Sequence, residues 1–459
     1  MPVLALLKKK STLSTVLFLF VFGFYLFTRL FLFSKEGSAA FGYDTGIYRH
    51  YIQGYFERIH DPSITPFGFS GFSNFMQTLG VNTDEILIGW YLLLTLILFL
   101  VFFVFVQTYT DTSTALLAVF LFSISIIQYE FFWWFYYRNF FALVFFFIAL
   151  ILIKHRSYLV ILPLIAMGTL HILTLFPIGI MMVILCIFQK EQRKFYFISG
   201  SVALGAIVLL NFKELLTYVG SIQKSGARVD SLNPSMSEFN GQFIDISFFW
   251  KHTVLYLFFG IMGLGYYFKK YLPLAVTFFI SFLPIVFGVL FYRRYYVFLD
   301  AFLIFFASVF LIHIIRKMKS NWVTAAFGIF FLIAVILNVN YVVHKRPLLT
   351  HEDLNQIIAT NEVAPASLIA VSSATAPWLY GFTHHKIIAP GIFEENRWSQ
   401  SEWQEFWTTS DTNRRHELLQ RYSTPLYIFL GAPERGFEGV LIRDSHFTQK
   451  GPWLWQYLP

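Results

Sequence analysis

The chain has 459 residues, of which 57% are hydrophobic, 20% aromatic and only 13% charged, and its mean hydropathy is +0.61. Soluble domains carry charge on roughly a quarter of their residues, so this composition excludes a water-soluble protein and indicates a polytopic membrane protein. A net charge of +8 is compatible with nucleic-acid binding, and the positions of the basic residues along the chain decide this question below. The single cysteine, Cys186, excludes an intrachain disulfide framework and a cysteine-based zinc site.

Eleven apolar segments follow one another along the first three quarters of the chain. A bilayer core of about 30 Å needs roughly 20 apolar residues in a helix, and most of these segments approach that length. The sequence therefore predicts an all-α polytopic membrane domain of about 11 transmembrane helices. The segments are Ser11–Phe33, Ile86–Val106, Thr114–Ile127, Asn139–Ile153, Tyr158–Leu170, Ile172–Phe188, Phe195–Phe212, Thr253–Phe268, Leu272–Phe291, Tyr296–Ile315 and Trp322–Val343.

Basic residues cluster in alternate loops between these segments. Cytoplasmic loops attract Lys and Arg, so the clusters predict a cytoplasmic N-terminus and, after eleven passes, an extracytoplasmic C-terminal region. The positive charge is then a signal of membrane topology, and we expect no nucleic-acid partner. The clusters are Lys8–Lys10, Lys154 with Arg156, Lys190 with Arg193 and Lys194, Lys269 with Lys270, and Arg316 with Lys317 and Lys319.

After residue 343 the composition changes abruptly. Residues 344–459 contain ten Lys or Arg and twelve Asp or Glu, without a run of membrane length. Ser367–Ser373 and Pro425–Gly431 have the pattern of short buried strands, whereas His351–Asn361 and Arg414–Tyr422 have that of amphipathic helices. We therefore expect a transmembrane domain over 1–343, with long extracytoplasmic loops at 34–85 and 213–252, followed by a small extracytoplasmic α/β domain over 344–459.

The first long loop opens with FGYDTGIYRHYIQGYFERIHDP. Apolar residues from Ile47 to Ile59 recur at helical spacing, which predicts a helix lying in the membrane interface. Asp44 stands at its start. One interpretation is a helix cap, a common role of Asp; the other is a general base held at the membrane surface. His50 is on the polar side of this helix.

Ionisable residues are otherwise found near the ends of the predicted spans, on the outer side. A transporter is expected to place polar groups and broken helices near the midplane, so this distribution favours an enzyme that works at the outer interface. A guanidinium pairs well with phosphate oxygens, which makes arginines here candidate phosphate ligands; the alternative is that they anchor the spans by snorkelling. The residues are Glu130, Arg138, His171, Arg293, Arg294 and Asp300.

Each of these residues has a specific expectation. Arg293 and Arg294 are the first candidates for a phosphate site and Arg138 the second. His171 either contacts the diphosphate or sugar, or is satisfied by the backbone at the end of a span. Asp300 is expected to pair with one of the two neighbouring arginines, and Glu130 with Arg138. The loop over 213–252 is either a lid or a connector.

The architecture resembles the GT-C superfamily of integral membrane glycosyltransferases. The resemblance covers the order of one span, a long outer loop opening with an acidic residue and a surface helix, many further spans and an extracytoplasmic α/β tail. The sequence segments on which the resemblance rests are YDTGIYRHY, GTLHILTLFP and FYRRYYVFLD. The resemblance implies a polyprenyl-phosphate-linked sugar donor and a catalytic role for Asp44. Many relatives have paired acids at that position, and Asp-Thr-Gly in this chain favours transfer without a metal.

The sequence thus predicts a membrane glycosyltransferase, of the hexosyl- or pentosyltransferase class. We expect Asp44 as the catalytic residue, with Arg293, Arg294, Arg138, His171 and His50 binding substrate and phosphate. The expected partners are the polyprenyl-phosphate-linked donor, the bilayer and an extracytoplasmic protein, lipid or glycan acceptor, without a metal or other cofactor. A flippase for lipid-linked oligosaccharides and an oligosaccharide ligase or polymerase are the alternatives. His384 and His385 project differently in any regular element and make a poor metal pair.

Overall fold

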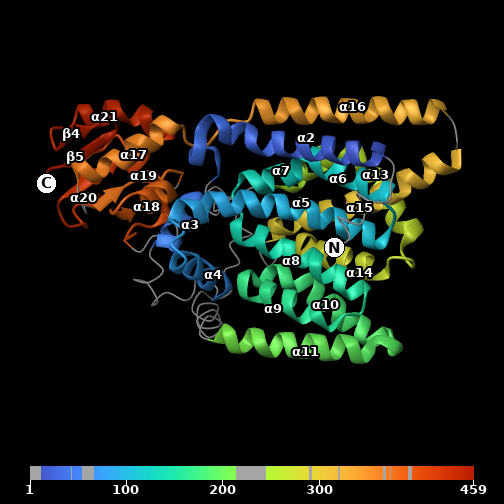
Figure 1. The fold of residues 1–459 in the computed structure, drawn as a ribbon. Helices are drawn as coiled ribbons and strands as arrows, with labels where there is room; N and C mark the ends of the chain where they lie inside the picture. Colours follow the sequence, from blue (N-terminus) through green and yellow to red (C-terminus); the bar gives the residue numbers. More distant parts are fainter. Residues whose placement is uncertain are drawn as a thin grey trace. The chain divides into compact units, whose positions relative to one another are not determined.

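The computed structural model divides the chain into two compact units (Figure 1). Unit 1 comprises residues 1–31, 55–234 and 242–345, and unit 2 comprises residues 32–54, 235–241 and 346–459. Most of the loop over 213–252, which is expected to be either a lid or a connector, lies outside the residues that the structure describes. Those residues are 12–42, 44–53, 67–212, 244–288, 292–318, 321–364, 368–372, 374–390 and 395–459.

The described residues of unit 1 form helices joined by short turns, and several of these helices run in a common direction (Figure 1). It contains most of α2 (Thr12–Glu36), then α4 (Phe67–Thr78), η2 (Glu85–Gly89), α5 (Trp90–Tyr109), α6 (Thr112–Ile124), α7 (Ile126–Trp133), α8 (Tyr137–Lys154), η3 (Tyr158–Val160), α9 (Ile161–Leu170), α10 (Ile172–Phe188), η4 (Lys190–Gln192), α11 (Arg193–Leu210), α13 (Ile246–Tyr267), α14 (Leu272–Phe287), η7 (Tyr292–Tyr295), α15 (Tyr296–Met318) and α16 (Asn321–Val343).

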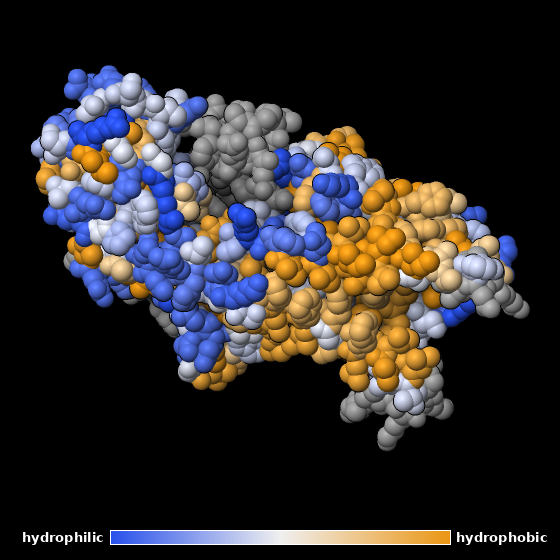
Figure 2. All heavy atoms as spheres, turned by 90° about the horizontal axis from the view of Figure 1, so that it is seen from above, coloured by the Kyte–Doolittle hydropathy of each residue, from blue (hydrophilic) through white to orange (hydrophobic). Residues whose placement is uncertain are grey.

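Within the described residues, every predicted membrane segment is largely helical. Seven described helices are long and apolar enough to cross a membrane, or eight if α6 and α7, which meet at an angle of 56°, form one broken span. The remaining predicted segments coincide with the shorter apolar helices Tyr158–Leu170, Ile172–Phe188 and Leu272–Phe287. The chain is therefore a multi-pass membrane protein, and the surface of unit 1 in Figure 2 is largely hydrophobic.

Small residues allow the helices of unit 1 to pack closely. A Cβ on Gly260 of α13 would meet Leu303 of α15, and one on Gly263 would overlap the carbonyl group of Phe306. Lipid is as apolar as a leucine side chain, so helices in a membrane associate through such close backbone approach. The two glycines therefore fix α13 against α15.

A buried carboxylate holds the break between α6 and α7. Asp300 of α15 is fully buried and accepts hydrogen bonds from Ser125 Oγ at 2.8 Å, Gln128 Nε2 at 2.9 Å and the hydroxyl of Tyr256. Ser125 also caps α7, because its Oγ accepts from the Gln128 N–H. The expectation that Asp300 pairs with Arg293 or Arg294 is wrong: its position inside α15 turns it towards α6, α7 and α13.

Glu130 has a different partner from the expected Arg138. Its Oε1 lies 2.5 Å from Lys345 Nζ and 2.6 Å from the hydroxyl of Tyr341, and the Lys345 ammonium also lies 3.7 Å from the centre of the Trp133 ring. Glu130 and Lys345 are both largely buried. The pair therefore connects α7 to the end of α16.

Unit 2 is built around a five-stranded sheet. Its elements are η1 (Gly37–Ala40), α3 (Asp44–Gln53), α17 (His351–Val363), β1 (Leu368–Ala370), α18 (Ala376–Phe382), β2 (Lys386–Ile388), α19 (Gln400–Thr408), α20 (Thr412–Leu419), β3 (Leu426–Phe429), η8 (Ala432–Phe437), α21 (Glu438–Ile442), β4 (Phe447–Gly451) and β5 (Leu454–Tyr457). The strand order is β2-β1-β3-β5-β4, with β1 parallel to β2 and β3, and β5 antiparallel to β3 and β4.

Alternate residues of the central strands face two separate cores. Ile369 and Phe429 pack with α17 and α18 on one face, and Ala370 and Ile428 pack with α19, α20 and α21 on the other. Side chains of a strand alternate between faces, so a sheet covered on both sides is apolar at every position. This confirms the two predicted strands and the small sheet expected in the tail.

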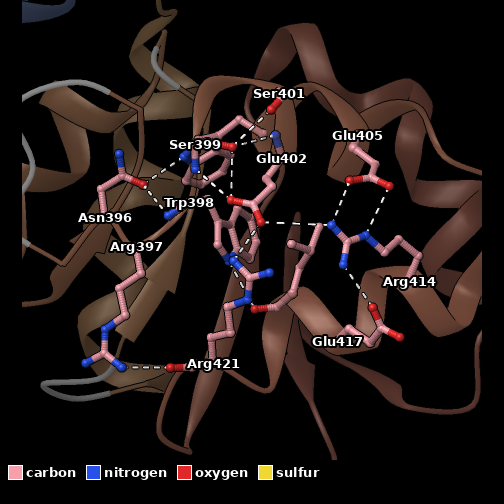
Figure 3. Close-up of polar contacts among 12 residues, drawn as sticks. Asn396, Arg397, Trp398, Ser399, Ser401, Glu402, Glu405, Arg414, Glu417 and Arg421 are labelled. Carbon is pink, nitrogen blue, oxygen red and sulfur yellow. Dashed lines mark hydrogen bonds and ion pairs between the residues drawn. The ribbon is translucent and has the colours of Figure 1, made fainter.

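A capped N-terminus and a network of ion pairs stabilise helices α19 and α20 of unit 2 (Figure 3). Ser399 and Glu402 form a capping box at the start of α19, and Arg421 Nη1 lies 2.7 Å from Glu402 Oε1. Arg414 binds Glu405 through two parallel contacts of 3.0 and 3.1 Å. The Ser399 backbone N–H and the Arg421 guanidinium hold the pKa of Glu402 at about 2, well below its usual range.

We expect the Glu402→Gln variant to lower the unfolding temperature of unit 2 at pH 7, because a charged acceptor is lost from the capping box, which contributes about 1 kcal/mol. The folded pKa of Glu402 lies below its unfolded value, so its contribution is present above about pH 4.5 and is lost as the pH falls towards 2. Thermal unfolding of wild type and variant across this range should show a converging difference. A difference that stays constant with pH would contradict the assignment.

Candidate functional site: a basic cluster at three helix N-termini

Three helices of unit 1 begin beside the predicted phosphate-binding residues. Arg138 lies in the first turn of α8, His171 immediately precedes α10, and Arg294 lies in η7, which leads directly into α15. The N-terminus of a helix carries partial positive charge and unpaired backbone N–H groups. We call Arg138, Asn139, His171 and Arg294 the basic cluster.

His171 and Arg294 are in direct contact. His171 occupies a one-residue break between α9 and α10, with extended backbone at φ −159°, and is buried. Its Nε2 lies 3.1 Å from Arg294 Nη1, and its Nδ1 lies 2.9 Å from Thr174 Oγ1. Because a guanidinium can only donate, Nε2 accepts, and the proton of the imidazole is on Nδ1. The neutral ring therefore orients Arg294 without adding charge.

Asn139 completes the contact from α8. Its Oδ1 accepts a hydrogen bond of 3.4 Å from Arg294 Nη1. Its buried Nδ2 has no hydrogen-bond partner among the described residues, so it is a donor that an anion can satisfy. Arg294 also lies over the Tyr136 ring, 5.3 Å from its centre, and the charge of Arg138 acts on His171 as well.

Arg293 has other contacts than its neighbour. Its Nε donates to the Tyr292 hydroxyl at 3.2 Å, and its guanidinium carbon lies 5.5 Å from the centre of the same ring. Tyr295 of the same turn donates to the Leu173 carbonyl at 3.2 Å, which ties η7 to α10. Of the predicted phosphate-binding residues, the structure thus brings together Arg138, His171 and Arg294, whereas the contacts described for Arg293 are with Tyr292.

The predicted cytoplasmic basic residues lie at the opposite ends of the same helices. Lys154 ends α8, about 27 Å from its start at 1.5 Å per residue; Lys190 follows α10, and Arg316 lies in the last turn of α15. Arg316 pairs with Asp111 at 2.8 Å. Unit 1 therefore has one end with the basic cluster and another with the residues predicted to face the cytoplasm.

Asp44 and His50 belong to unit 2, where α3 packs against α18. Asp44 is the half-buried first residue of α3, at the positive end of the helix. His50 Nδ1 donates to the Tyr380 carbonyl at 3.0 Å, and the two rings stack at 3.6 Å. Arg49 donates to the Gly381 carbonyl at 2.8 Å. These contacts place the polar side of α3 against α18, and Tyr48 and Ile52 of its apolar side are buried as well, so protein covers part of a side that was expected in the membrane interface.

Two glycines set the distance between α3 and α18. A Cβ on Gly46 would overlap the Pro377 carbonyl, and one on Gly381 would overlap the carbonyl of Gly46. Helix backbones approach this closely only where neither residue has a side chain. Gly46 is two residues from Asp44, so this contact fixes the start of α3 within unit 2.

Two residues with informative contacts, Arg29 and Asn139, were not identified from the sequence. Arg29 is buried within α2, donates to Thr28 and to the Ser123 carbonyl at 3.0 Å, and lies 4.3 Å from the centre of the Tyr25 ring. A charged residue inside an apolar span is itself a signal, and it could have been used. Asn139 carried no such signal.

No protein-family model and no curated protein matches the sequence. Among solved structures, three of the oligosaccharyltransferase of Archaeoglobus fulgidus are similar: with a tethered acceptor peptide containing the NVT sequon (TM-score 0.59, 13% identity), in the apo form (0.62, 12%) and in complex with Zn and sulfate (0.59, 12%). The matches cover 90–91% of this chain and 68–69% of the other. At 12–13% identity, this likeness shows that the chain shares the overall fold of these membrane proteins.

Proposed function

We propose that the protein is a membrane glycosyltransferase that transfers a sugar from a polyprenyl-phosphate-linked donor to an acceptor outside the cytoplasm. The observation that carries the proposal is the basic cluster, in which Arg294 is oriented by His171 and Asn139 at the converging N-termini of three helices. This arrangement suits the phosphate of a lipid-linked donor. The N-terminus would be cytoplasmic and the domain over 344–459 extracytoplasmic, as the basic residues at the other helix ends favour.

In the proposed reaction the acceptor hydroxyl oxygen bonds to the anomeric carbon of the sugar while the bond from that carbon to the phosphate oxygen breaks. Asp44 accepts the hydroxyl proton as the general base. The leaving phosphate gains negative charge, and Arg294, with Arg138 and Arg293, neutralises it. His50 is proposed to assist in substrate binding. Charge that develops in a transition state is stabilised most by fixed partners in a low-dielectric site.

The fold supports this class of reaction. The similar structures are those of an oligosaccharyltransferase, of which one carries a tethered acceptor peptide and another is a complex with Zn and sulfate. A sulfate has the tetrahedral oxygens of a phosphate. Transfer of a whole oligosaccharide is consistent with the same proposal. The protein must again accept a proton from the acceptor and neutralise the leaving phosphate of the donor.

We propose that the transfer itself needs no metal. One of the similar structures is a complex with Zn, but α3 contains a single carboxylate, Asp44, followed by Thr45 and Gly46. His50 of the same helix donates its Nδ1 proton to a backbone carbonyl. One carboxylate does not make a zinc site, which takes three or four protein ligands, so no step is assigned to a metal at this helix.

The Asp44→Asn variant tests the proposal. We expect it to lose transfer by about 100-fold or more, because the amide cannot accept the proton in general-base catalysis, while its abundance in the membrane stays normal. The measurement is consumption of labelled polyprenyl-phosphate and polyprenyl-diphosphate sugars by membranes that contain the protein and its natural acceptors.

The exposed Asp84 belongs to the same predicted outer loop, so Asp84→Asn is the matched control and should retain activity. Wild-type donor consumption in Asp44→Asn membranes would remove Asp44 from the mechanism. Absence of donor consumption with the wild-type protein across both donor classes would remove the proposed activity.

A further inference from the structure

Three metal-ligating side chains gather in unit 2, far along the chain from Asp44. His416 lies on α20, and Asp444 and His446 lie in the short connection between α21 and β4. Their ligand atoms all lie within 4.8 Å of one another, and this is the one such group among the described residues. The rings of His416 and His446 are 4.0 Å apart, centre to centre.

Two of the atoms that face each other are buried and unsatisfied. His416 is 9% exposed and Asp444 is 8% exposed. His416 Nε2 lies 3.3 Å from Asp444 Oδ2, but the contact lacks hydrogen-bond geometry, and neither atom has another hydrogen-bond partner among the described residues. A buried polar atom without a partner costs free energy, so the contact is incomplete as it stands.

The other nitrogen of His416 is already used. Its Nδ1 lies 3.2 Å from the Tyr457 hydroxyl. In metal sites the second ring nitrogen of a histidine ligand usually makes such a contact, which fixes the tautomer and directs the free nitrogen at the ion. Tyr457 therefore stands where a supporting partner of a metal ligand is expected.

The third candidate ligand, His446, lies at the side of the cluster that is accessible to solvent. The His446 side chain is 47% exposed, and its Nδ1 lies 3.1 Å from Asp444 Oδ1. Two imidazoles and one carboxylate suit zinc and related transition metals, whereas magnesium and calcium prefer oxygen ligands alone. The exposed side leaves room for water as a fourth ligand.

We propose that His416, Asp444 and His446 bind a divalent transition metal, with Zn²⁺ the best fit to the donor set. The ion would satisfy His416 Nε2 and Asp444 Oδ2 together and link α20 to the connection that leads into β4. None of these three residues belongs to α3 or to the basic cluster, so the inference does not rest on the proposed transfer reaction and assigns no catalytic step to the ion.

The test is zinc binding to the full-length protein, purified in detergent without a polyhistidine tag and stripped with a chelator. Titration with Zn²⁺ against a chromogenic competitor should show one tight equivalent. His446→Ala, at the exposed position, should fold normally and weaken binding at least 100-fold, as should Asp444→Asn. Tyr457→Phe should weaken it about 10-fold, as expected for a supporting partner. Mg²⁺ in millimolar excess should not compete.

His384→Ala is the matched control, since His384 is an exposed histidine of the same unit outside the cluster, and it should bind zinc like the wild type. Thermal unfolding with and without Zn²⁺ gives an independent readout: the ion should raise the unfolding temperature of the wild type and leave that of His446→Ala unchanged. The proposal is overturned if the wild type binds no zinc, or if His446→Ala and Asp444→Asn bind it as tightly as the wild type.

Discussion

The Arg294→Ala variant is expected to lose glycosyl transfer by about 100-fold or more, the usual cost of removing one fixed donor to developing charge. In the structure this guanidinium is held by His171, Asn139 and the Tyr136 ring, so its position is set before substrate binds. Arg294→Lys keeps the charge but loses the planar fork and the ring stacking, and we expect an intermediate activity.

The measurement is the donor-consumption assay on membranes with matched protein amounts. Arg316→Ala is the control and should stay near wild-type activity. Arg316 lies in the last turn of α15, the helix that η7 leads into, and it pairs there with Asp111. If Arg294→Ala and Arg316→Ala lose activity equally, the cluster has no special role in the reaction.

The second large effect is expected at Gly46, where Ala should destabilise unit 2 by about 3 kcal/mol through overpacking. Its Cβ would meet the Pro377 carbonyl, which is backbone and cannot move aside like a flexible side chain. Separation of α3 from α18 would also displace Asp44, so transfer should fall together with stability. Thermal unfolding and donor consumption measure the two effects.

Gly381→Ala should act in the same way, since it approaches Gly46 from the other helix. The control is Gly439→Ala in α21, where a Cβ meets nothing within 4 Å and where Ala favours the helix; it should be neutral or stabilising. Unchanged unfolding of Gly46→Ala would show that the two helices do not approach as closely as described.

The helices of unit 1 could be predicted because their signal is local. Apolar runs such as Ile172–Phe188 coincide with a helix from end to end, and the strands around Ile369 and Ile428 were visible as short apolar runs. By contrast, β4 has mostly exposed side chains, so it lacked the apolar pattern by which a strand is recognised. Pattern predicts an element when burial and periodicity coincide.

The contacts of the candidate site could be predicted only in part. His171 and Arg294 were each identified, but their contact spans 123 positions, and no pattern in one sequence reports which helix ends meet. Asp300 shows the converse error: closeness in sequence to Arg294 suggested a pair, whereas helix geometry turns its carboxylate to Ser125 and Tyr256. His416 and Asp444 were missed because no pattern in one sequence reports a contact between distant positions.

The docking of α3 on α18 has a consequence for biogenesis. Arg49 and Gly381 are separated by 332 positions, so a ribosome completes the helix that carries Asp44 long before it makes the surface on which that helix rests. Every segment between them has to be synthesised first. Helix α3 therefore lacks its packing partner α18 through most of translation, and the two helices can pack together only at the last stage of folding.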